Sequence, residues 1–234
     1  MQDDASTQRM LNPELKAKKY LANYTDWYIF ISSKNPDMSK AENTKEYIVE
    51  HTAPIFNKKG YKGTSLTDLT EATGLTKGAL YGNFKNKDEI ALAVYDHNIE
   101  MVKEIFFGRN VSFTNSIDQL IAIPELVKKN FSLLAAHGGC PILNTSVEAD
   151  DNHPLLKKKV TQTIKAWRKN IESIIEKGIT AGVIKKETDP SKYAILFITL
   201  IEGCLMLTKI TNDLEFLNGT MDNLKKIILV ELKK

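Results

Sequence analysis

The chain has 234 residues, of which 42% are hydrophobic and 26% charged, as in an average soluble globular protein. This composition excludes a collagen-like, low-complexity or wholly disordered chain. Two cysteines are too few for a disulfide scaffold or a four-cysteine zinc site. The net charge of +3 permits a polyanionic partner without requiring one. The longest apolar run, 193–201, is too short for a membrane span of about 20 residues, so we expect no membrane partner.

Residues 1–40 differ from the rest of the chain. Their aromatic residues follow no sustained period, and 32–37 is rich in turn-forming residues. Because Met38 precedes a polar helix start, we expect translation to begin there and the preceding segment to be an upstream extension. The alternative is an N-terminal helix that docks on the body. Asp3 and Asp4 lie where an export signal needs positive charge, which predicts a cytoplasmic protein with reduced cysteines.

From residue 41 onward, apolar residues recur at helical spacing. Ile48, Thr52 and Phe56 share one face of a first helix, which contains Pro54 and ends at Gly60. Further helices are expected at 66–73, 76–84, from 88 onward, 116–136, 154–182, 190–211 and 213–232. No stretch alternates as a strand would, and no flexible linker interrupts the chain, so we expect an all-α protein that packs as one body.

The segment 60–90 combines a helix, a tight turn and a second short helix. If Leu80 and Phe84 anchor the second helix, the 100° spacing of helical residues places Gly78 and Gly82 on its outward ridge. An interior glycine destabilises a helix by about 1 kcal/mol relative to alanine. We therefore interpret the bare ridge as a surface that another molecule approaches closely, such as a DNA major groove roughly 12 Å wide.

The same segment concentrates positive charge. Between residues 58 and 87, six lysines and two carboxylates give a local charge of +4, whereas the whole chain carries +3. Thr64, Ser65 and Thr76 add hydroxyl groups and free N–H groups at helix starts, which suit phosphate oxygens. The alternative is a solvated lysine-rich loop with two marginal helices that pack against something else.

This segment resembles the DNA-binding domain of the TetR family of bacterial transcriptional regulators, and the resemblance covers about residues 41–101. The matching positions are Gly60-Tyr61, Thr64-Ser65, Thr73-Gly74, Thr76, Gly78, Leu80-Tyr81, Asn83-Phe84 and Lys87-Asp88. Thr73 replaces a commoner alanine, and Asn83 replaces a commoner histidine. The second replacement puts in doubt which contact is made at position 83, but it does not put DNA binding in doubt. The resemblance implies an N-terminal three-helix helix-turn-helix domain packed on a larger helical domain over 102–234.

The resemblance also implies the site residues and the partner. Thr76–Phe84 would be the recognition helix. The implied DNA-binding residues are Thr64, Ser65, Thr76, Lys77, Gly78, Tyr81, Asn83, Lys85 and Lys87. Among them Thr64, Ser65, Tyr81 and Lys87 would contact phosphates, and Lys77, Gly78 and Asn83 would face base edges. The partner would be a roughly palindromic double-stranded operator, with repression as the family's usual outcome and activation as the alternative.

For the C-terminal half, the resemblance implies a homodimer through about 190–232 and a pocket for a small-molecule effector. The segment 190–211 is apolar almost all round, as in a helix buried on more than one side, although an internal core helix would look the same. The candidate pocket residues, each of which also fits a plain core position, are Phe131, Leu134, Ile142, Leu143, Trp167 and Ile171. The sequence does not identify the effector.

Residues 138–144 break the helical pattern and place Cys140 at a helix N-terminus, where a cysteine can have a lowered pKa. One alternative function is therefore a thiol-based redox or electrophile sensor through Cys140, and the other interpretation is a small apolar residue in a tight break. Cys204 lies in an apolar helix and is interpreted as structural. We interpret Asp150-Asp151 and His153 as a polar helix cap and not as a metal site.

Motifs typical of enzymes do not occur in the sequence. It contains no GxSxG, P-loop, GxGxxG or HExxH pattern, and its four histidines show no catalytic spacing. We expect no enzymatic activity, no metal and no cofactor. A helical protein-interaction module that reuses the helix-turn-helix remains an alternative of a different class.

Overall fold

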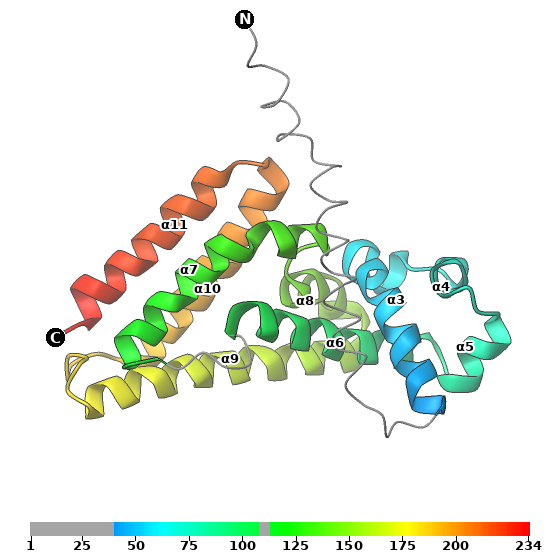
Figure 1. Ribbon diagram of the computed structural model, residues 1–234, viewed down its shortest axis with the longest axis horizontal. Coiled ribbons are helices and arrows are strands. Elements are labelled where there is room, and N and C mark those ends of the chain that lie inside the picture. The colour runs from blue at the N-terminus through cyan, green and yellow to red at the C-terminus, as the bar shows by residue number, and fades with distance from the viewer. Residues whose placement is uncertain (1–39, 108–112) are drawn as a thin grey trace, which may run out of the picture. The chain divides into compact units, whose positions relative to one another are not determined.

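Figure 1 shows a computed structural model of the chain, which describes residues 40–107 and 113–234. Residues 47–234 form one compact unit. The expected start at Met38 and the extension before it lie outside the described residues.

The described residues confirm the all-α prediction. They contain no β-strand beyond one isolated antiparallel bridge between Ile184 and Lys233. The helices are α3 Lys40–Gly63, α4 Leu66–Thr73, α5 Lys77–Asn83, α6 Lys87–Phe107, α7 Ser116–Ala136, α8 Pro141–Asn152, α9 Pro154–Thr180, α10 Pro190–Thr211 and α11 Leu214–Ile227, followed by a π-helical turn, η1 Ile228–Leu232.

Most helices have the predicted bounds. The helices expected at 116–136 and 190–211 are α7 and α10. The helix expected at 154–182 ends at Thr180, and the one expected at 213–232 is divided into α11 and η1. Helix α8 was not predicted as an element, because the break before it dominated the interpretation of that region.

Helix α3 continues past Gly60, where the sequence predicted its end. Gly60 has φ 72 and ψ 177, a conformation that favours glycine, and helical structure resumes as far as Gly63. Gly60 is therefore a kink inside α3. Pro54 lies in the regular part of the helix before this kink.

Two hydrophobic cores meet along α6. The smaller core joins α3, α4 and α5 to the first half of α6, with Leu69, Leu80 and Ile90 fully buried. The larger core begins with Tyr95 and Ile99 of α6 and continues through α7 to η1. Since one continuous helix contributes to both cores and crosses the predicted boundary between 41–101 and 102–234, no linker separates the two parts.

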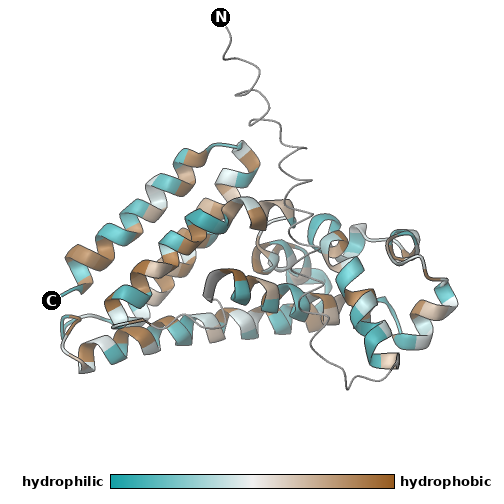
Figure 2. Ribbon diagram, in the orientation of Figure 1, coloured by the Kyte–Doolittle hydropathy of each residue, from teal (hydrophilic) through white to brown (hydrophobic). Residues whose placement is uncertain are grey.

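Helix α10 packs between α9 and α11 in the C-terminal bundle (Figure 1). Along α11 hydrophobic and hydrophilic residues alternate by turns, as expected of a helix with one face covered (Figure 2). By length and composition alone α10 could cross a membrane, although a third of its most apolar window is buried here. The apolar run 193–201 covers only part of α10, because isolated polar residues interrupt the helix. The helix as a whole is still mostly apolar.

Candidate functional site

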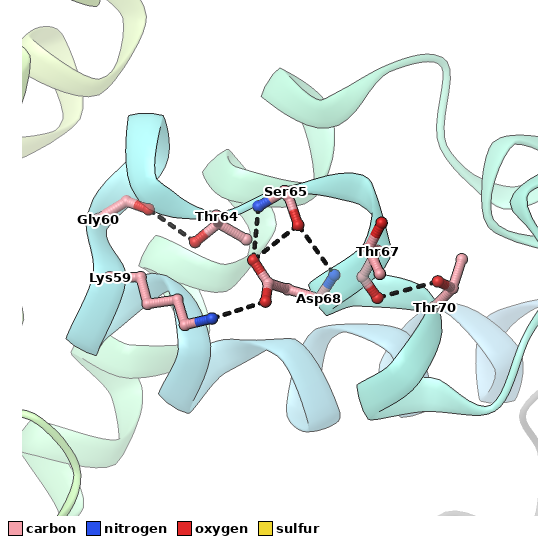
Figure 3. Close-up of polar contacts among 7 residues, drawn as sticks. All are labelled: Lys59, Gly60, Thr64, Ser65, Thr67, Asp68 and Thr70. Atoms are coloured by element: carbon pink, nitrogen blue, oxygen red, sulfur yellow. Dashed lines mark hydrogen bonds and ion pairs between the residues drawn. The ribbon is translucent and has the colours of Figure 1, made fainter.

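The N-terminus of α4 is held by a reciprocal set of polar contacts (Figure 3). The Ser65 hydroxyl accepts a hydrogen bond from the Asp68 backbone N–H at 3.1 Å, and the Ser65 backbone N–H donates to Asp68 Oδ2 at 2.7 Å. Lys59 Nζ lies 2.6 Å from Asp68 Oδ1, and this contact lowers the pKa of Asp68 to about 2. The capping box fixes where α4 begins, and the ion pair ties that point to α3.

The turn between α4 and α5 is the predicted glycine turn. Gly74 has φ 65, and its N–H donates to the Thr70 carbonyl at 2.9 Å, which ends α4. The Thr76 hydroxyl accepts a hydrogen bond from the Ala79 N–H at 3.2 Å and so begins α5. The helix-turn-helix geometry thus follows from local caps at both sides of one left-handed glycine.

The outward side of α5 is bare backbone, as the spacing predicted. Leu80 and Phe84 are buried, whereas Gly78 and Gly82, which we call the glycine ridge, are exposed. A Cβ atom built at Gly82 would meet nothing within 4 Å, and one at Gly78 would meet only the Thr76 hydroxyl, at 3.9 Å. No contact among the described residues therefore requires glycine at either position.

Most of the predicted DNA-binding residues are exposed or half-buried. Ser65, Thr76, Lys77 and Lys85 are exposed, and Tyr81 and Asn83 are half-buried on α5. Lys87 is also half-buried.

The ammonium group of Lys87 is held by an aromatic ring. It lies 4.4 Å from the centroid of the Tyr61 ring, and desolvation lowers the pKa of Lys87. Tyr61 is held in turn by a hydrogen bond from its hydroxyl to Asp88, and burial raises the pKa of Tyr61 to about 12. The position of the Lys87 cation thus depends on the segment that follows the Gly60 kink.

Thr64 is a correction to the predicted set. The residue is fully buried, and its hydroxyl donates to the Gly60 carbonyl at 2.7 Å (Figure 3). Because the kink at Gly60 frees a backbone acceptor, Thr64 turns inward to satisfy it. Its side chain is therefore part of the helix junction and does not reach the surface where a phosphate would lie.

Helix α8, which sequence reasoning missed, joins the helix-turn-helix to the C-terminal bundle. The Glu148 carboxylate accepts hydrogen bonds from the backbone N–H groups of Tyr61 and Lys62, the latter at 2.5 Å. A Cβ atom at Gly60 would overlap the Glu148 carboxylate, so this contact requires glycine in addition to the kink. No pattern around Glu148 in the sequence signals this long-range contact.

The turn before α8 makes a second contact with α3. Asn57 Nδ2 donates to the carbonyl oxygens of His137, at 2.7 Å, and Gly139, at 3.0 Å. Asn144 Nδ2 donates back to the Asn57 carbonyl at 3.0 Å and to the Gly138 carbonyl at 2.9 Å. These amide contacts are buried or partly buried, so α8 and α3 are held together at both ends of α8.

A cavity of about 550 Å³ lies among α6, α7, α8, α9 and α10. Its apolar lining consists of Ile99, Val102, Ile123, Val127, Ile142, Ala166, Trp167, Ile201 and Leu205. Its other lining residues are Lys103, Cys140, Gln162, Thr163, Asn170 and Glu202. This volume and lining suit a small, mostly apolar molecule.

Two of the six predicted pocket residues, Ile142 and Trp167, line this cavity. The other four do not: Leu134 and Ile171 are fully buried in the core, and Phe131 and Leu143 pack against it. On α7 the cavity lies beside Ile123 and Val127, so residues from Phe131 onward fall beyond its end.

Cys140 is a correction to the expectation of a lowered pKa. The residue precedes α8 and is buried, and its Sγ donates to Glu202 Oε1 at 3.1 Å. Burial and the neighbouring Glu202 raise the pKa of the Cys140 thiol well above its ordinary value, which outweighs the backbone N–H groups of Ile142 and Leu143. In this environment the thiol is held in its neutral form, whereas a reactive thiol must ionise readily.

Cys204, His153 and Asp150 make contacts within and between helices. Cys204 is buried, and its Sγ donates to the Ile201 carbonyl at 3.2 Å. His153 Nδ1 accepts from the Leu156 N–H at 3.2 Å and caps α9, as predicted for His153, whereas Asp150 and Asp151 lie in the last turn of α8. Asp150 pairs with Lys157 at 2.7 Å.

Comparisons with known proteins agree with this geometry. The family model for bacterial regulatory proteins of the tetR family matches residues 48–94, and the model for the tetracyclin repressor-like C-terminal domain matches residues 116–224. The chain is 30% identical over 184 residues to the HTH-type transcriptional regulator in the lacX 3′ region of Lactococcus lactis subsp. lactis, covering 78% of this chain and 92% of that protein. It is 22% identical over 175 residues to the HTH-type transcriptional repressor DhaR of Mycobacterium sp. (strain GP1), covering 73% and 85%.

A solved structure shows the same fold. The TetR-family transcriptional regulator from Cytophaga hutchinsonii superimposes with a TM-score of 0.77 at 39% identity, covering 84% of this chain and 98% of that one. A helix-turn-helix with an open glycine ridge, a helical domain with a cavity, and these matches lead to one conclusion. The chain belongs to the TetR family and is a DNA-binding transcriptional regulator.

Proposed function

We propose that this regulator binds a palindromic operator as a homodimer, represses transcription in the cytoplasm, and releases the DNA when a small-molecule effector occupies the cavity. The observation that carries the DNA-binding part is the glycine ridge, whose openness nothing within the described chain requires. Repression is supported by the family and by one relative, the transcriptional repressor DhaR.

We assign the contacts by chemistry and exposure. Ser65, Tyr81 and Lys87 contact phosphates and set the register of the protein on the duplex. Lys77 and Asn83 face base edges beside the glycine ridge, where the backbone of Gly78 can approach the groove floor. Thr76 and Lys85 complete the set at the two ends of the recognition helix.

The homodimer is supported by an apolar surface on the C-terminal bundle. Large hydrophobic side chains remain exposed on α10, α11 and η1, namely Ile195, Met206, Leu207, Ile210, Leu214, Phe216, Leu229 and Val230. Since soluble monomers seldom expose so many neighbouring apolar groups, we assign this surface to a second copy of the chain. Two-fold symmetry then places the two recognition helices about one DNA turn or somewhat more apart.

The link between the sites is α8. Its first turn borders the cavity through Cys140 and Ile142, and its second half holds the backbone of Tyr61 and Lys62 through Glu148. An effector that favours another position of α8 would shift the population toward a form with different spacing of the DNA-binding domains. Its effect is limited to its differential affinity for the two forms.

Selection of bound DNA from a random duplex pool by the full-length protein tests the proposal. We expect enrichment of a two-fold symmetric sequence by the wild type. A Lys165→Ala variant, which removes an exposed lysine of α9, should select the same sequence. Failure to enrich any sequence over bulk competitor at low ionic strength would overturn the operator-binding proposal.

A further inference from the structure

We propose that the cavity binds an apolar organic cation, a molecule with a protonated amine that Glu202 receives. This inference rests on the proposed function, in which the cavity is the effector site, and it specifies the chemical class of that effector. It is carried by the position and hydrogen bonding of one carboxyl group in a mostly apolar cavity.

Glu202 is a cavity-lining carboxyl group with one oxygen unused by the protein. Its Oε1 accepts a hydrogen bond from the Cys140 thiol, a weak donor. Its Oε2 is buried, and no donor from the described part of the chain reaches it. A buried carboxyl group with an unsatisfied oxygen destabilises a protein, so its presence in a ligand-sized cavity points to a ligand that supplies the missing donor.

The cavity contains no cation placed to neutralise Glu202. Lys103 is the one lysine or arginine among the cavity-lining residues that the structure describes. Its ammonium group pairs with Glu100 at 2.6 Å, and 55% of its side chain is exposed. Lys103 therefore belongs to a solvated surface pair at the rim and is not the partner of the buried carboxyl.

The nearby hydroxyl groups are already used. The Tyr95 hydroxyl donates to Thr163 Oγ1 at 3.1 Å, and that hydroxyl donates in turn to the Lys159 carbonyl at 3.1 Å. Among the described residues, the Cys140 thiol is the hydrogen-bond partner of the Glu202 carboxyl group. A protonated amine would supply both a charge and N–H donors at this point.

The charge of a ligand should determine how tightly it binds beside Glu202. Burial raises the pKa of Glu202 to about 7, so near neutral pH a bound cation would complete its ionisation. A neutral ligand with a hydroxyl group would gain a hydrogen bond but no charge pairing. An anionic ligand would place a second negative charge beside the carboxyl in a low-dielectric space, which is unfavourable.

Three naphthalene probes that differ in charge test this ranking. Protonated 1-naphthylmethylamine, neutral 1-naphthylmethanol and anionic 1-naphthylacetate are titrated into the full-length protein, and the dissociation constants are measured by calorimetry. We expect the amine to bind about tenfold or more tightly than the alcohol, and the carboxylate to bind most weakly. Equal affinities, tighter binding of the carboxylate, or binding of none of the probes would overturn the inference.

Two variants test whether Glu202 is the origin of the preference for the protonated amine. In Glu202→Gln, which keeps the side-chain size, the ratio of amine to alcohol affinity should fall to about one, with alcohol binding little changed. In Glu176→Gln, which removes an exposed carboxylate of α9 outside the cavity lining, the ratio should stay as in the wild type. An unchanged ratio in Glu202→Gln would contradict the role of Glu202.

Operator selection on the same preparations separates this inference from the proposed function. If the protein selects an operator but shows no preference for the amine, the cation inference fails and DNA binding stands. If it prefers the amine through Glu202 but selects no DNA, the cavity assignment stands and the operator proposal fails.

Discussion

The glycine ridge of α5 and the carboxyl group of Glu202 each destabilise the free protein, but in different ways. Gly78 and Gly82 lower the intrinsic stability of a short exposed helix, a local effect of about 1 kcal/mol per residue. Glu202 carries a desolvation penalty that depends on five helices coming together. The first cost suits a large ligand that contacts the backbone of α5 from outside, and the second suits a small ligand that pairs with the carboxyl group in the cavity.

The largest expected effect comes from filling the ridge with negative charge. Gly78→Glu should weaken binding to every DNA sequence by about 100-fold or more, because a carboxylate would meet phosphates and fill the space that the groove occupies. The side chain has open space in the free protein, so the melting temperature should change little. Fluorescence anisotropy with labelled duplexes and circular dichroism would measure the two quantities. Unchanged affinity would break the assignment of α5 as recognition helix.

Alanine substitutions of Lys77 and Lys87 should affect DNA binding in different ways. Lys77→Ala should relax base preference, with a loss of about 1–3 kcal/mol on the operator and less on other duplexes, whereas Lys87→Ala should weaken all duplexes alike and reduce the salt slope by about one. Affinities for operator and scrambled duplexes over a series of salt concentrations distinguish the two. Equal losses on both duplexes for Lys77→Ala would remove its base-reading role.

Glu202 should impose a pH dependence on stability. Its pKa is raised from 4.5 to about 7 in the folded protein, so the unfolded chain releases this proton first as pH rises. With respect to this group, the free energy of unfolding is therefore highest below pH 4.5, where the carboxyl group is protonated in both states. It falls as pH rises toward 7, which leaves a penalty of roughly 1–3 kcal/mol at pH 8.

Replacing that carboxyl group should flatten the curve. Glu202→Gln should be more stable than the wild type at pH 8 in urea unfolding. The neighbouring titratable groups Tyr95, Cys140 and Cys204 all have raised pKa values and remain neutral over this range, so they contribute little slope. Parallel curves for variant and wild type from pH 5 to pH 8 would contradict a desolvated Glu202.

The smallest expected effect is a gain in stability from the ridge itself. Gly82→Ala should stabilise the free protein by up to about 1 kcal/mol, since its new methyl group meets nothing within 4 Å, while DNA binding becomes weaker. Thr161→Ala, an exposed substitution on α9, serves as the control that should leave DNA binding unchanged. If Gly82→Ala improved both stability and DNA binding, the ridge would not be shaped by close approach.

Local features were predictable from the sequence, and long-range ones were not. The caps at Ser65 and Thr76 and the turn at Gly74 depend on residues within four positions, so their patterns identified them. Thr64 was assigned to the surface because its burial depends on a kink that its own neighbourhood does not reveal. Glu148 contacts residues more than 80 positions earlier, and no local pattern encodes such a contact.

The residues that line the cavity were still harder to predict from the sequence. Ile142 and Trp167 were predicted as lining residues, but Leu134 and Ile171 have the same apolar character and are core. Which of two apolar faces borders a cavity is decided by how α7 and α9 are placed against α10. Glu202 interrupts a helix whose apolar residues predict an interface, and its hydrogen-bond partner Cys140 lies 62 positions earlier, so no local pattern identifies it.

One titration tests whether the two sites bind DNA and a cation and whether they are coupled. The full-length protein is titrated onto its selected operator and onto a scrambled duplex at the same salt concentration, with and without 1-naphthylmethylamine. We expect the wild type to bind the operator much more tightly than the scrambled duplex and to lose that binding when the amine is present. In Glu202→Gln the amine should no longer release the operator. Equal affinity for the two duplexes, or operator binding that the amine leaves unchanged, would contradict this expectation.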